Sequence, residues 1–245
     1  MNTKKLHEEY HSKIKLQKRI ISPDNFTYRQ IIRFISKYVT FEKKVLDIGS
    51  GVGTFDLYLS DKVKSIIGID ISSRAIAIAK ENAKVFGLKN IKYFVGDVGK
   101  YKFTSKFDLI ICAEIIEHVK DEKKLLVDLQ KHLNIDGIIF LTTPLMTAPL
   151  HKVGLTKDFD KRVGHLRRYT LDKLKKLTKE TDLKIINVYY REGVFRNMFF
   201  VFPIFDQLTR IANSFAFVSD IFTFIDNFSL KLFGASNIYL IIKKK

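Results

Sequence analysis

Cysteine and long apolar runs are the features that this sequence most lacks. A single cysteine, Cys112, among 245 residues excludes an internal disulfide and fits a reducing compartment. The longest apolar run, MFFVFPIF at 198–205, is far shorter than the ~20 residues that a membrane-spanning helix needs. The polar start of the chain has no apolar segment of the kind found in signal peptides. We therefore expect a cytoplasmic protein that is stabilised by an ordinary apolar core.

Acidic residues are also scarce, because 43 Lys and Arg face only 26 Asp and Glu. The resulting net charge of +17 is concentrated in residues 1–44 and 151–191. Such an excess fits an anionic partner, which could be nucleic acid, anionic lipid or a phosphorylated substrate. It fits equally a soluble protein with a generally basic composition.

Apolar segments with the pattern of strands alternate along the chain with segments of helical periodicity. We expect strands at 44–49, 65–72, 91–97, 107–114, 137–144, 183–192 and 236–245. We expect helices at 28–39, 53–62, 74–86, 121–133 and 171–181. This alternation predicts an α/β fold with right-handed crossovers, in which a doubly wound, mostly parallel, seven-stranded Rossmann-like sheet carries helices on both faces.

Local signals suggest where several helices begin and end. Ser22 followed by Pro23 predicts a helix start, Ser72 or Ser73 can cap the next long helix, and Thr170 can cap a later one. Gly87 stands where a helix-terminating glycine is expected. The segment after Pro144 is predicted to be a long loop. We divide the chain into a helical N-terminal cover (1–43), a cofactor-binding core (44–191), a Phe-rich helical insert (192–236) and the last strand of the core sheet (237–245).

The stretch VLDIGSGVGTF places three glycines at alternate positions directly after a buried strand. Glycines at a strand-to-helix turn let backbone N–H groups approach a ligand closely. The dinucleotide pattern G-x-G-x-x-G fails here because its third glycine falls on Thr54. What is present is D-x-G-x-G-x-G, formed by Asp47, Gly49, Gly51 and Gly53.

With this loop, residues 44–190 resemble the class I S-adenosylmethionine-dependent methyltransferases. The resemblance implies that the loop wraps the amino-acid end of the cofactor and that Asp47 helps to hold its ammonium group. It also implies that Asp70, beside Ile71, takes the ribose hydroxyls, for which a carboxylate is a good bidentate acceptor. Asp97 would read the adenine amino group, with Val98 beside the ring, and Ala113 would border the methyl-transfer site.

The stretch CAEIIEH follows the fourth predicted strand, where this family lines the transfer site. Glu114, Glu117 and His118 are spaced to share one face of a helical turn, and His165 lies in the segment that resembles the lid over the methyl acceptor. The set resembles those of the ubiquinone-pathway O-methyltransferases and of the small-RNA 2′-O-methyltransferases. Three roles stay open: a Mg²⁺, Mn²⁺ or Zn²⁺ site formed by Glu114, Glu117, His118 and His165, a metal-free base at His118 or His165, or a structural role.

The Asn/Asp-Pro-Pro-aromatic motif of many nitrogen-methylating relatives is absent, since that place reads Ala113-Glu114-Ile115-Ile116. This favours an oxygen or carbon acceptor. We therefore predict an O-methyltransferase, with His118, His165 and Glu114 as candidate catalytic residues. Its acceptor would be small or lipid-linked, such as a quinone precursor, isoprenoid or glycan. The alternatives are RNA 2′-O-methylation and a non-catalytic peripheral membrane protein that keeps the cofactor fold.

The insert before the last strand holds 11 of the 21 phenylalanines, between Phe195 and Phe233. Several of them, including Phe199 and Phe202, recur at helical spacing. Residues 195–233 could lie in a membrane interface and admit a lipid-linked acceptor, which would make the protein peripheral to the membrane. The same pattern fits a helical cap packed on the sheet or a dimer surface. Nucleic acid is the less favoured partner, because no RNA-binding module is recognisable.

Overall fold

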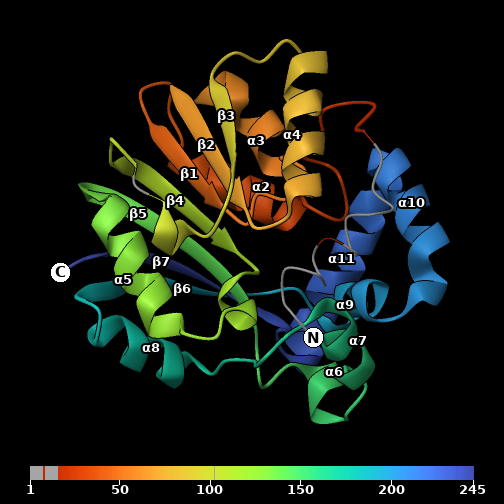
Figure 1. Cartoon of the computed structure of the whole chain (residues 1–245). Coiled ribbons are helices and arrows are strands. Elements are labelled where there is room, and N and C mark those ends of the chain that lie inside the picture. The colour runs from red at the N-terminus through yellow and green to blue at the C-terminus, as the bar shows by residue number, and fades with distance from the viewer. Residues whose placement is uncertain (1–7, 9–15, 102) are drawn as a thin grey trace.

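A computed structural model of the chain describes residues 8, 16–101 and 103–245, and it contains one mixed seven-stranded sheet (Figure 1). The strands are β1 (Lys44–Ile48), β2 (Ser65–Asp70), β3 (Ile91–Val95), β4 (Phe107–Ala113), β5 (Leu133–Pro144), β6 (Leu183–Arg191) and β7 (Asn237–Lys244). Their order across the sheet is β3-β2-β1-β4-β5-β7-β6. β7 is antiparallel to both β5 and β6, and the other neighbours are parallel. The predicted fold class is confirmed.

Helices cover both faces of the sheet, and each face has its own apolar core. One face packs against α2 (Arg29–Ile35), α3 (Thr54–Leu59) and α4 (Ser73–Val85). The other packs against α5 (Glu122–His132) and α8 (Leu171–Lys179). The central strands are buried on both faces, which explains why they read as nearly continuous apolar runs.

The remaining helices gather beyond the carboxyl ends of the parallel strands (Figure 1). They are α6 (Pro149–Lys152), α7 (Lys157–Val163), α9 (Val194–Val201), α10 (Asp206–Ser214) and α11 (Ala216–Phe233). In a doubly wound sheet, ligands bind in the crevice outside these strand ends. The helices therefore stand where they can enclose a ligand.

A third apolar cluster joins the N-terminal segment to the insert. Phe26 packs edge-to-face on Phe199 and on Phe222, with ring centroids 5.3 and 5.7 Å apart. Phe199 is only 5% exposed. The phenylalanines of α9 thus fill the interior of the insert instead of forming an outer apolar face. The boundaries proposed for the four segments of the chain stay a prediction.

Two local predictions were wrong. The helix expected from Ser22 begins only at Arg29, because the Ser22 hydroxyl accepts a hydrogen bond from the backbone N–H of Asp24 and so forms a turn. The segment after Pro144 is not a plain loop but contains α6 and α7. The caps at Ser72 and Thr170 are confirmed, as each side chain accepts a hydrogen bond from the first turn of its helix. Gly87 has the expected left-handed backbone, with φ of 67°.

Candidate functional site

The glycine loop after β1 has a backbone that other residues adopt only with strain. Gly49, Gly51 and Gly53 all have positive φ, at 71°, 54° and 79°. A Cβ atom at Gly49 would lie 2.0 Å from Cδ1 of Ile115, and one at Gly53 would lie 2.2 Å from the Tyr93 hydroxyl. Both glycines are therefore required by their conformation and by the neighbours that approach them.

Asp70 ends β2 directly beside this loop. Its carboxylate accepts hydrogen bonds from the backbone N–H of Gly51 at 3.0 Å and of Ser72 at 2.8 Å. These two bonds fix the orientation of a carboxylate that is 7% exposed and lines two adjoining cavities. A carboxylate has about four acceptor positions, so it keeps capacity for a ligand hydroxyl pair.

The first cavity, of about 500 Å³, is here named the Asp97 cavity. Its walls include the predicted cofactor residues Gly49, Asp70, Ile71, Asp97 and Val98. The Asp97 side chain accepts a hydrogen bond from the backbone N–H of Gly99, which fixes the turn after β3. The structure thus brings together the residues that the sequence assigned to ribose and adenine.

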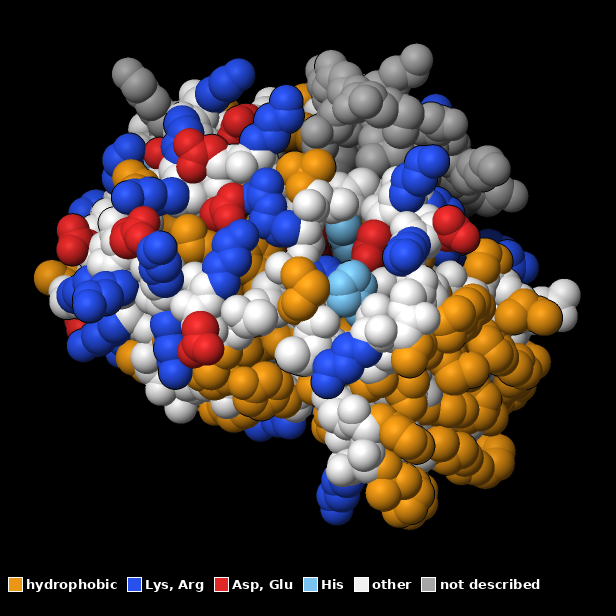
Figure 2. Space-filling view, turned by 90° about the horizontal axis from the view of Figure 1, so that it is seen from below, with side chains coloured by type: hydrophobic (Ala, Val, Ile, Leu, Met, Phe, Trp, Pro, Cys, Tyr) orange, Lys and Arg blue, Asp and Glu red, His pale blue; other side chains and the backbone are white. Residues whose placement is uncertain are grey.

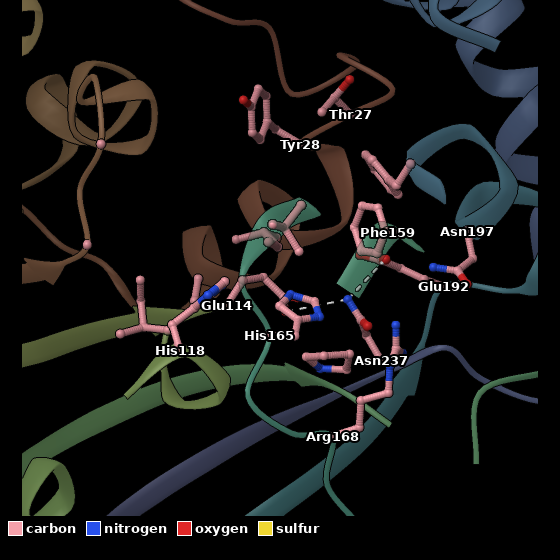
Figure 3. Close-up of a pocket in the computed structure, with 18 of the residues that line it drawn as sticks. Thr27, Tyr28, Glu114, His118, Phe159, His165, Arg168, Glu192, Asn197 and Asn237 are labelled. Carbon is pink, nitrogen blue, oxygen red and sulfur yellow. Dashed lines mark hydrogen bonds between the residues drawn. The ribbon is translucent and has the colours of Figure 1, made fainter. Parts of the chain in front are cut away.

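The second cavity, of about 490 Å³, is named the Glu192 cavity. Gly49, Asp70, Ile115 and His118 line both cavities, so the two meet at the end of β4. Figure 3 shows the Glu192 cavity with Thr27 and Tyr28 above it, His118 on one side, and Glu192 and Asn197 on the other. Four more residues that the sequence predicted for the site also line this cavity: Gly51, Ala113, Glu114 and His165.

Asp47 does not line either cavity. It lies 2% exposed beneath the glycine loop, beside Asp56 of α3 and the Tyr93 hydroxyl. Burial, and then the neighbouring Asp56 carboxylate, raise the pKa of Asp47 well above its usual range. Asp47 is therefore part of a buried pair of carboxyl groups with Asp56, and Gly53 likewise lies outside both linings.

Two histidines face each other in the Glu192 cavity, and one of them, His118, also lines the Asp97 cavity. The rings of His118 and His165 lie 4.9 Å apart between centroids. Nδ1 of His165 lies 2.8 Å from a carboxylate oxygen of Asp160, and Nε2 lies 3.9 Å from Oε1 of Glu117. Nδ1 of His118 lies 3.2 Å from the backbone oxygen of Gly164.

Asp160 orients His165 and is itself held by Arg168. Nε and Nη2 of Arg168 donate to its two carboxylate oxygens at 2.9 and 2.6 Å. Burial would raise the pKa of Asp160, but hydrogen bonds from His165 and Arg168 outweigh it and hold that pKa well below its usual range. The side chain of His165 is 7% exposed, so an ionised carboxylate fixes a nearly buried imidazole.

Glu117, His118 and His165 each offer a ligand atom, and these atoms lie within 4.8 Å of one another. The Glu117 carboxylate is fully buried. Its Oε2 accepts a hydrogen bond from the Thr143 hydroxyl, and Oε1 has no hydrogen-bond partner among the described residues. Burial and the Glu114 carboxylate raise the pKa of Glu117 well above its usual range, so a cation beside it would be favourable.

The spacing predicted that Glu114 shares a helical face with Glu117 and His118, and this prediction is wrong. Its backbone is left-handed, with φ of 56°, and the helical turn covers only Ile116–His118. Glu114 instead accepts hydrogen bonds from the Thr142 hydroxyl at 2.7 Å and from Nδ2 of Asn237 at 3.4 Å. Its carboxylate therefore stands outside the group of three metal-ligand candidates.

Sequence reasoning missed several polar residues of the Glu192 cavity. They are Asp160 beneath His165 and the cavity-lining Arg168, Glu192, Asn197 and Asn237. These residues come from α7, from the segment before α8, from the position directly after β6, and from α9 and β7. Nothing in the local sequence predicts that these residues converge, although the acidic α7 segment KDFD shortly before GHLRRY was a weak signal for Asp160.

Comparisons with known proteins agree with this geometry. The model of the family described as a methyltransferase domain matches residues 40–187. Ubiquinone biosynthesis O-methyltransferase of Pelagibacter ubique (strain HTCC1062) is 39% identical over 100 residues, which are 41% of each chain. The mitochondrial enzyme of that name from Schizosaccharomyces pombe is 31% identical over 103 residues, which are 41% of this chain and 38% of that protein. The matches thus span less than half the length of these curated relatives.

Solved structures share the fold at low identity. Coclaurine N-methyltransferase bound to N-methylheliamine and S-adenosylhomocysteine superposes with a TM-score of 0.65 at 14% identity, covering 98% of this chain and 85% of that chain. The [4+2]-cyclase SpnF superposes with a TM-score of 0.62 at 15% identity, covering 88% and 80%. These likenesses show the fold alone, since one fold hosts several chemistries. The family match over 40–187 decides the identity: this chain belongs to the S-adenosylmethionine-dependent methyltransferases.

Proposed function

We propose that this protein transfers a methyl group from S-adenosylmethionine to a hydroxyl of a small or lipid-linked acceptor. The observation that carries the proposal is His165, which Asp160 holds in the Glu192 cavity beside His118, a residue that lines both cavities. An imidazole whose Nδ1–H donates to a carboxylate presents Nε2 as a proton acceptor. A hydroxyl needs such a base more than an amine does, because it is a poor nucleophile at neutral pH.

The two cavities suit the two reactants. The cofactor, which supplies an electrophilic methyl group on its sulfonium, would place its adenosine in the Asp97 cavity and its amino-acid end along the glycine loop. Asp70 would accept from the ribose hydroxyls, and Gly49 and Gly51 let the backbone approach. The hydroxyl acceptor would enter the Glu192 cavity beside His165, and alignment where the two cavities meet is the main contribution that the protein makes.

A divalent metal is the alternative role for the same histidines. The cluster of Glu117, His118 and His165 fits one, since a buried carboxylate oxygen without a partner among the described residues faces two imidazoles. Two histidines and one glutamate are a common donor set for Zn²⁺, and Mn²⁺ or Mg²⁺ are the further candidates. A bound metal would lower the pKa of the acceptor hydroxyl. Glu114, the fourth ligand expected from the sequence, is engaged elsewhere.

Chelation separates these two roles. If the metal is needed, chelator should abolish methyl transfer and added Mg²⁺, Mn²⁺ or Zn²⁺ should restore it. Calorimetry should then show metal binding to the wild type and none to Glu117→Gln. Full activity in chelator would remove the metal and leave His165 as the base. In that case His165→Ala should lower kcat by roughly 10²–10⁴-fold with little change in cofactor affinity.

The insert supports a lipid-linked acceptor at a membrane surface. Figure 2 shows a broad apolar surface at the lower right, over the region of α10 and α11. Its most exposed members are Ile204, Phe215, Phe217, Phe224, Phe228, Leu232 and Phe233. None of the helices in the described ranges combines the length and apolarity needed to cross a membrane. A surface of this kind is typical of peripheral contact with lipid.

Transfer of a tritiated methyl group tests the proposal directly. The protein would be incubated with methyl-labelled S-adenosylmethionine and, in parallel, with total lipid extract, water-soluble metabolites and RNA. We expect the label in an alkali-stable ether of the lipid or small-molecule fraction. Label in RNA would establish the alternative 2′-O-methyltransferase. Cofactor binding without transfer to any fraction would favour a non-catalytic membrane protein.

A further inference from the structure

Two glutamates with strained backbones face the Glu192 cavity. Glu114 directly follows β4 with φ of 56°, and Glu192 directly follows β6 with φ of 60°. A residue other than glycine is strained in the left-handed region, and such strain concentrates at functional sites. Glycine would satisfy the backbone at either place. The glutamate side chains must therefore contribute something that glycine cannot.

Asn237 connects the two carboxylates. Its Nδ2 donates to Glu114 Oε1 at 3.4 Å and to Glu192 Oε2 at 3.2 Å. The Tyr239 hydroxyl donates to Glu192 Oε1 at 2.8 Å. The residues that directly follow β4 and β6, together with Asn237 of β7, thus present one polar wall to the cavity, here named the Glu192 wall. Asn197 of α9 completes it.

This wall keeps hydrogen-bonding capacity that the described residues do not use. Asn197 is 7% exposed, and its buried Oδ1 has no hydrogen-bond partner within the described ranges. Oε2 of Glu114, which lines the same cavity, accepts no hydrogen bond from any described residue either. A buried polar atom without a partner is unfavourable, so a ligand group that donates a hydrogen bond to Asn197 Oδ1 gains affinity.

The charges near the wall favour a neutral ligand group. Burial, and then the Glu192 carboxylate, raise the pKa of Glu114 to about 7, and burial raises the pKa of Glu192, while Arg168 and Arg196 lie close enough to oppose these two shifts. The two arginines already offset part of the negative charge of the wall, and its paired carboxylates disfavour an anion. A hydroxyl both donates and accepts, which matches a carboxylate beside an amide, whereas an ammonium group only donates. Several neighbouring hydroxyls match the wall best.

We infer that the Glu192 wall binds the hydroxyl groups of a polyhydroxylated substrate head group, with Glu192 and Asn197 as its specificity-determining residues. The inference rests on the proposed function, and it narrows the substrate to a polyol- or sugar-like head. Figure 3 shows Glu192 and Asn197 across the cavity from His118, so a head group held there would extend toward the histidines. Its remaining bulk would lie between Phe159 and Phe200, which also line the cavity.

Three probes with one tail test the head-group preference. Octyl β-D-glucoside, octan-1-ol and octylamine would be titrated by calorimetry, below their aggregation concentrations, into the S-adenosylhomocysteine-loaded protein. We expect the glucoside to bind at least tenfold more tightly than either other probe. Because all three carry the same tail, contacts with the apolar surface of α10 and α11 cancel in this comparison.

Substitutions in the Glu192 wall test whether its residues cause the preference for the glucoside. Asn197→Leu and Glu192→Gln should each remove most of the tenfold advantage, while affinity for S-adenosylhomocysteine and the melting temperature show that the fold is intact. Asn187→Leu makes the same change at an exposed residue of β6 and should leave the advantage unchanged. If Asn197→Leu unfolds, Glu192→Gln still decides the question.

Three results would overturn the inference: equal affinity for glucoside and octanol, tightest binding of octylamine, or a glucoside advantage that survives in both wall variants. These binding measurements need no turnover. A glucoside preference without methyl transfer to any fraction would therefore contradict the proposed function and leave the wall assignment standing. Methyl transfer to a monohydroxylated lipid, at a rate unchanged in Asn197→Leu, would support the proposed function and contradict the wall assignment.

Discussion

Buried carboxylates in this protein fall into two electrostatic classes that differ in their nearest neighbours. Asp160 lies beside Arg168 and His165, and its pKa is held low. Asp56 lies instead beside Asp47 and the Tyr93 hydroxyl, and burial raises its pKa to about 7. A carboxylate of the first class, such as Asp160, stays ionised near neutral pH and can orient a base such as His165. The second titrates near neutrality and therefore affects stability.

Replacing Asp56 with asparagine should stabilise the protein more at pH 8 than at pH 5. The folded-state pKa of Asp56 is raised above its unfolded value of about 3.9. Its contribution to stability is therefore complete below about pH 4 and is lost as the pH rises toward 7. Asparagine does not titrate, so the variant avoids this loss, which has a ceiling of about 1.4 kcal/mol per pH unit for one proton. Urea unfolding at both pH values measures it, and an equal difference at both would contradict the assignment.

Asp70→Ala should weaken binding of S-adenosylhomocysteine by roughly 10- to 100-fold. The physical reason is the loss of a charge-assisted hydrogen-bond acceptor, which contributes about 1.5–3 kcal/mol. Asp61→Ala removes an exposed carboxylate outside both cavities and should have no effect. Calorimetry on the three proteins gives the answer. Unchanged affinity in Asp70→Ala would place the ribose elsewhere. NAD should bind to none of them.

At the scale of single elements, α11 shows how an apolar helix can serve two surfaces. Its buried positions Ser219, Asp226 and Ser229 are polar, and its phenylalanines Phe224 and Phe228 are 76% and 60% exposed. This is the reverse of the usual pattern of a surface helix. The polar positions bond to buried partners in α2 and α9, which frees the aromatic face for another contact.

The double variant Phe224→Ser/Phe228→Ser should lose binding to anionic phospholipid vesicles. Burying one such ring in an apolar phase contributes about 1.5–3 kcal/mol, so removing two should reduce partitioning at least 100-fold. Lys231 and Arg210 are exposed on the same insert and would add attraction to an anionic surface. Co-sedimentation at low salt measures the effect.

A matched control is Val85→Ser/Ile135→Ser, which removes two exposed apolar side chains from α4 and β5. It should bind vesicles as the wild type does. Wild-type protein that stays in the supernatant would exclude the lipid surface and leave a dimer contact or lid as the role of α11.

At the scale of the whole molecule, two buried arginines join the N-terminal segment to the insert. Arg29 of α2 donates to Ser219, Thr223 and Asp220 of α11. Arg196 of α9 lies 3.5 Å from Asp226 and with its guanidinium carbon 4.0 Å from the ring centroid of Phe26. Both segments also line the Glu192 cavity, through Thr27 and Tyr28 on one side and Asn197 and Phe200 on the other. They form one cover over the site.

Arg196→Ala should lower the free energy of unfolding by about 3–5 kcal/mol, because it leaves the buried Asp226 carboxylate without its cation. Arg210→Ala, at an exposed position of α10, should change it by less than about 0.5 kcal/mol. Urea unfolding measures both. Hydrogen exchange should show that residues 24–35 and 194–233 lose protection together in Arg196→Ala. Loss of protection in the insert alone would mean that the two segments are independent.

The sheet and the cofactor half of the site could be predicted from the sequence. Strand periodicity placed β1 to β7, and the ends of parallel strands lie at one edge, so Gly49, Asp70 and Asp97 had to meet there. Local chemistry likewise determined the caps at Ser72 and Thr170, since a cap depends only on residues three positions apart. The helix start predicted at Ser22 was wrong for a reason that is also local. Its hydroxyl accepts a hydrogen bond from the nearby backbone N–H of Asp24 and forms a turn instead.

The other half of the site, the Glu192 cavity, was decided by the tertiary structure alone. Asp160, Glu192, Asn197 and Asn237 come from four elements whose convergence depends on how the insert folds back over the sheet. The left-handed backbone of Glu114, which removed it from the metal candidates, is set by its contacts with Thr142 and Asn237. The sequence also did not predict which face of α11 points outward. The polar side chains of α11 are buried against Arg29 and Arg196, and these contacts outweigh the tendency of its apolar side chains to face the core. Local sequence determines conformations that depend on neighbours along the chain, and these features depend on neighbours in space.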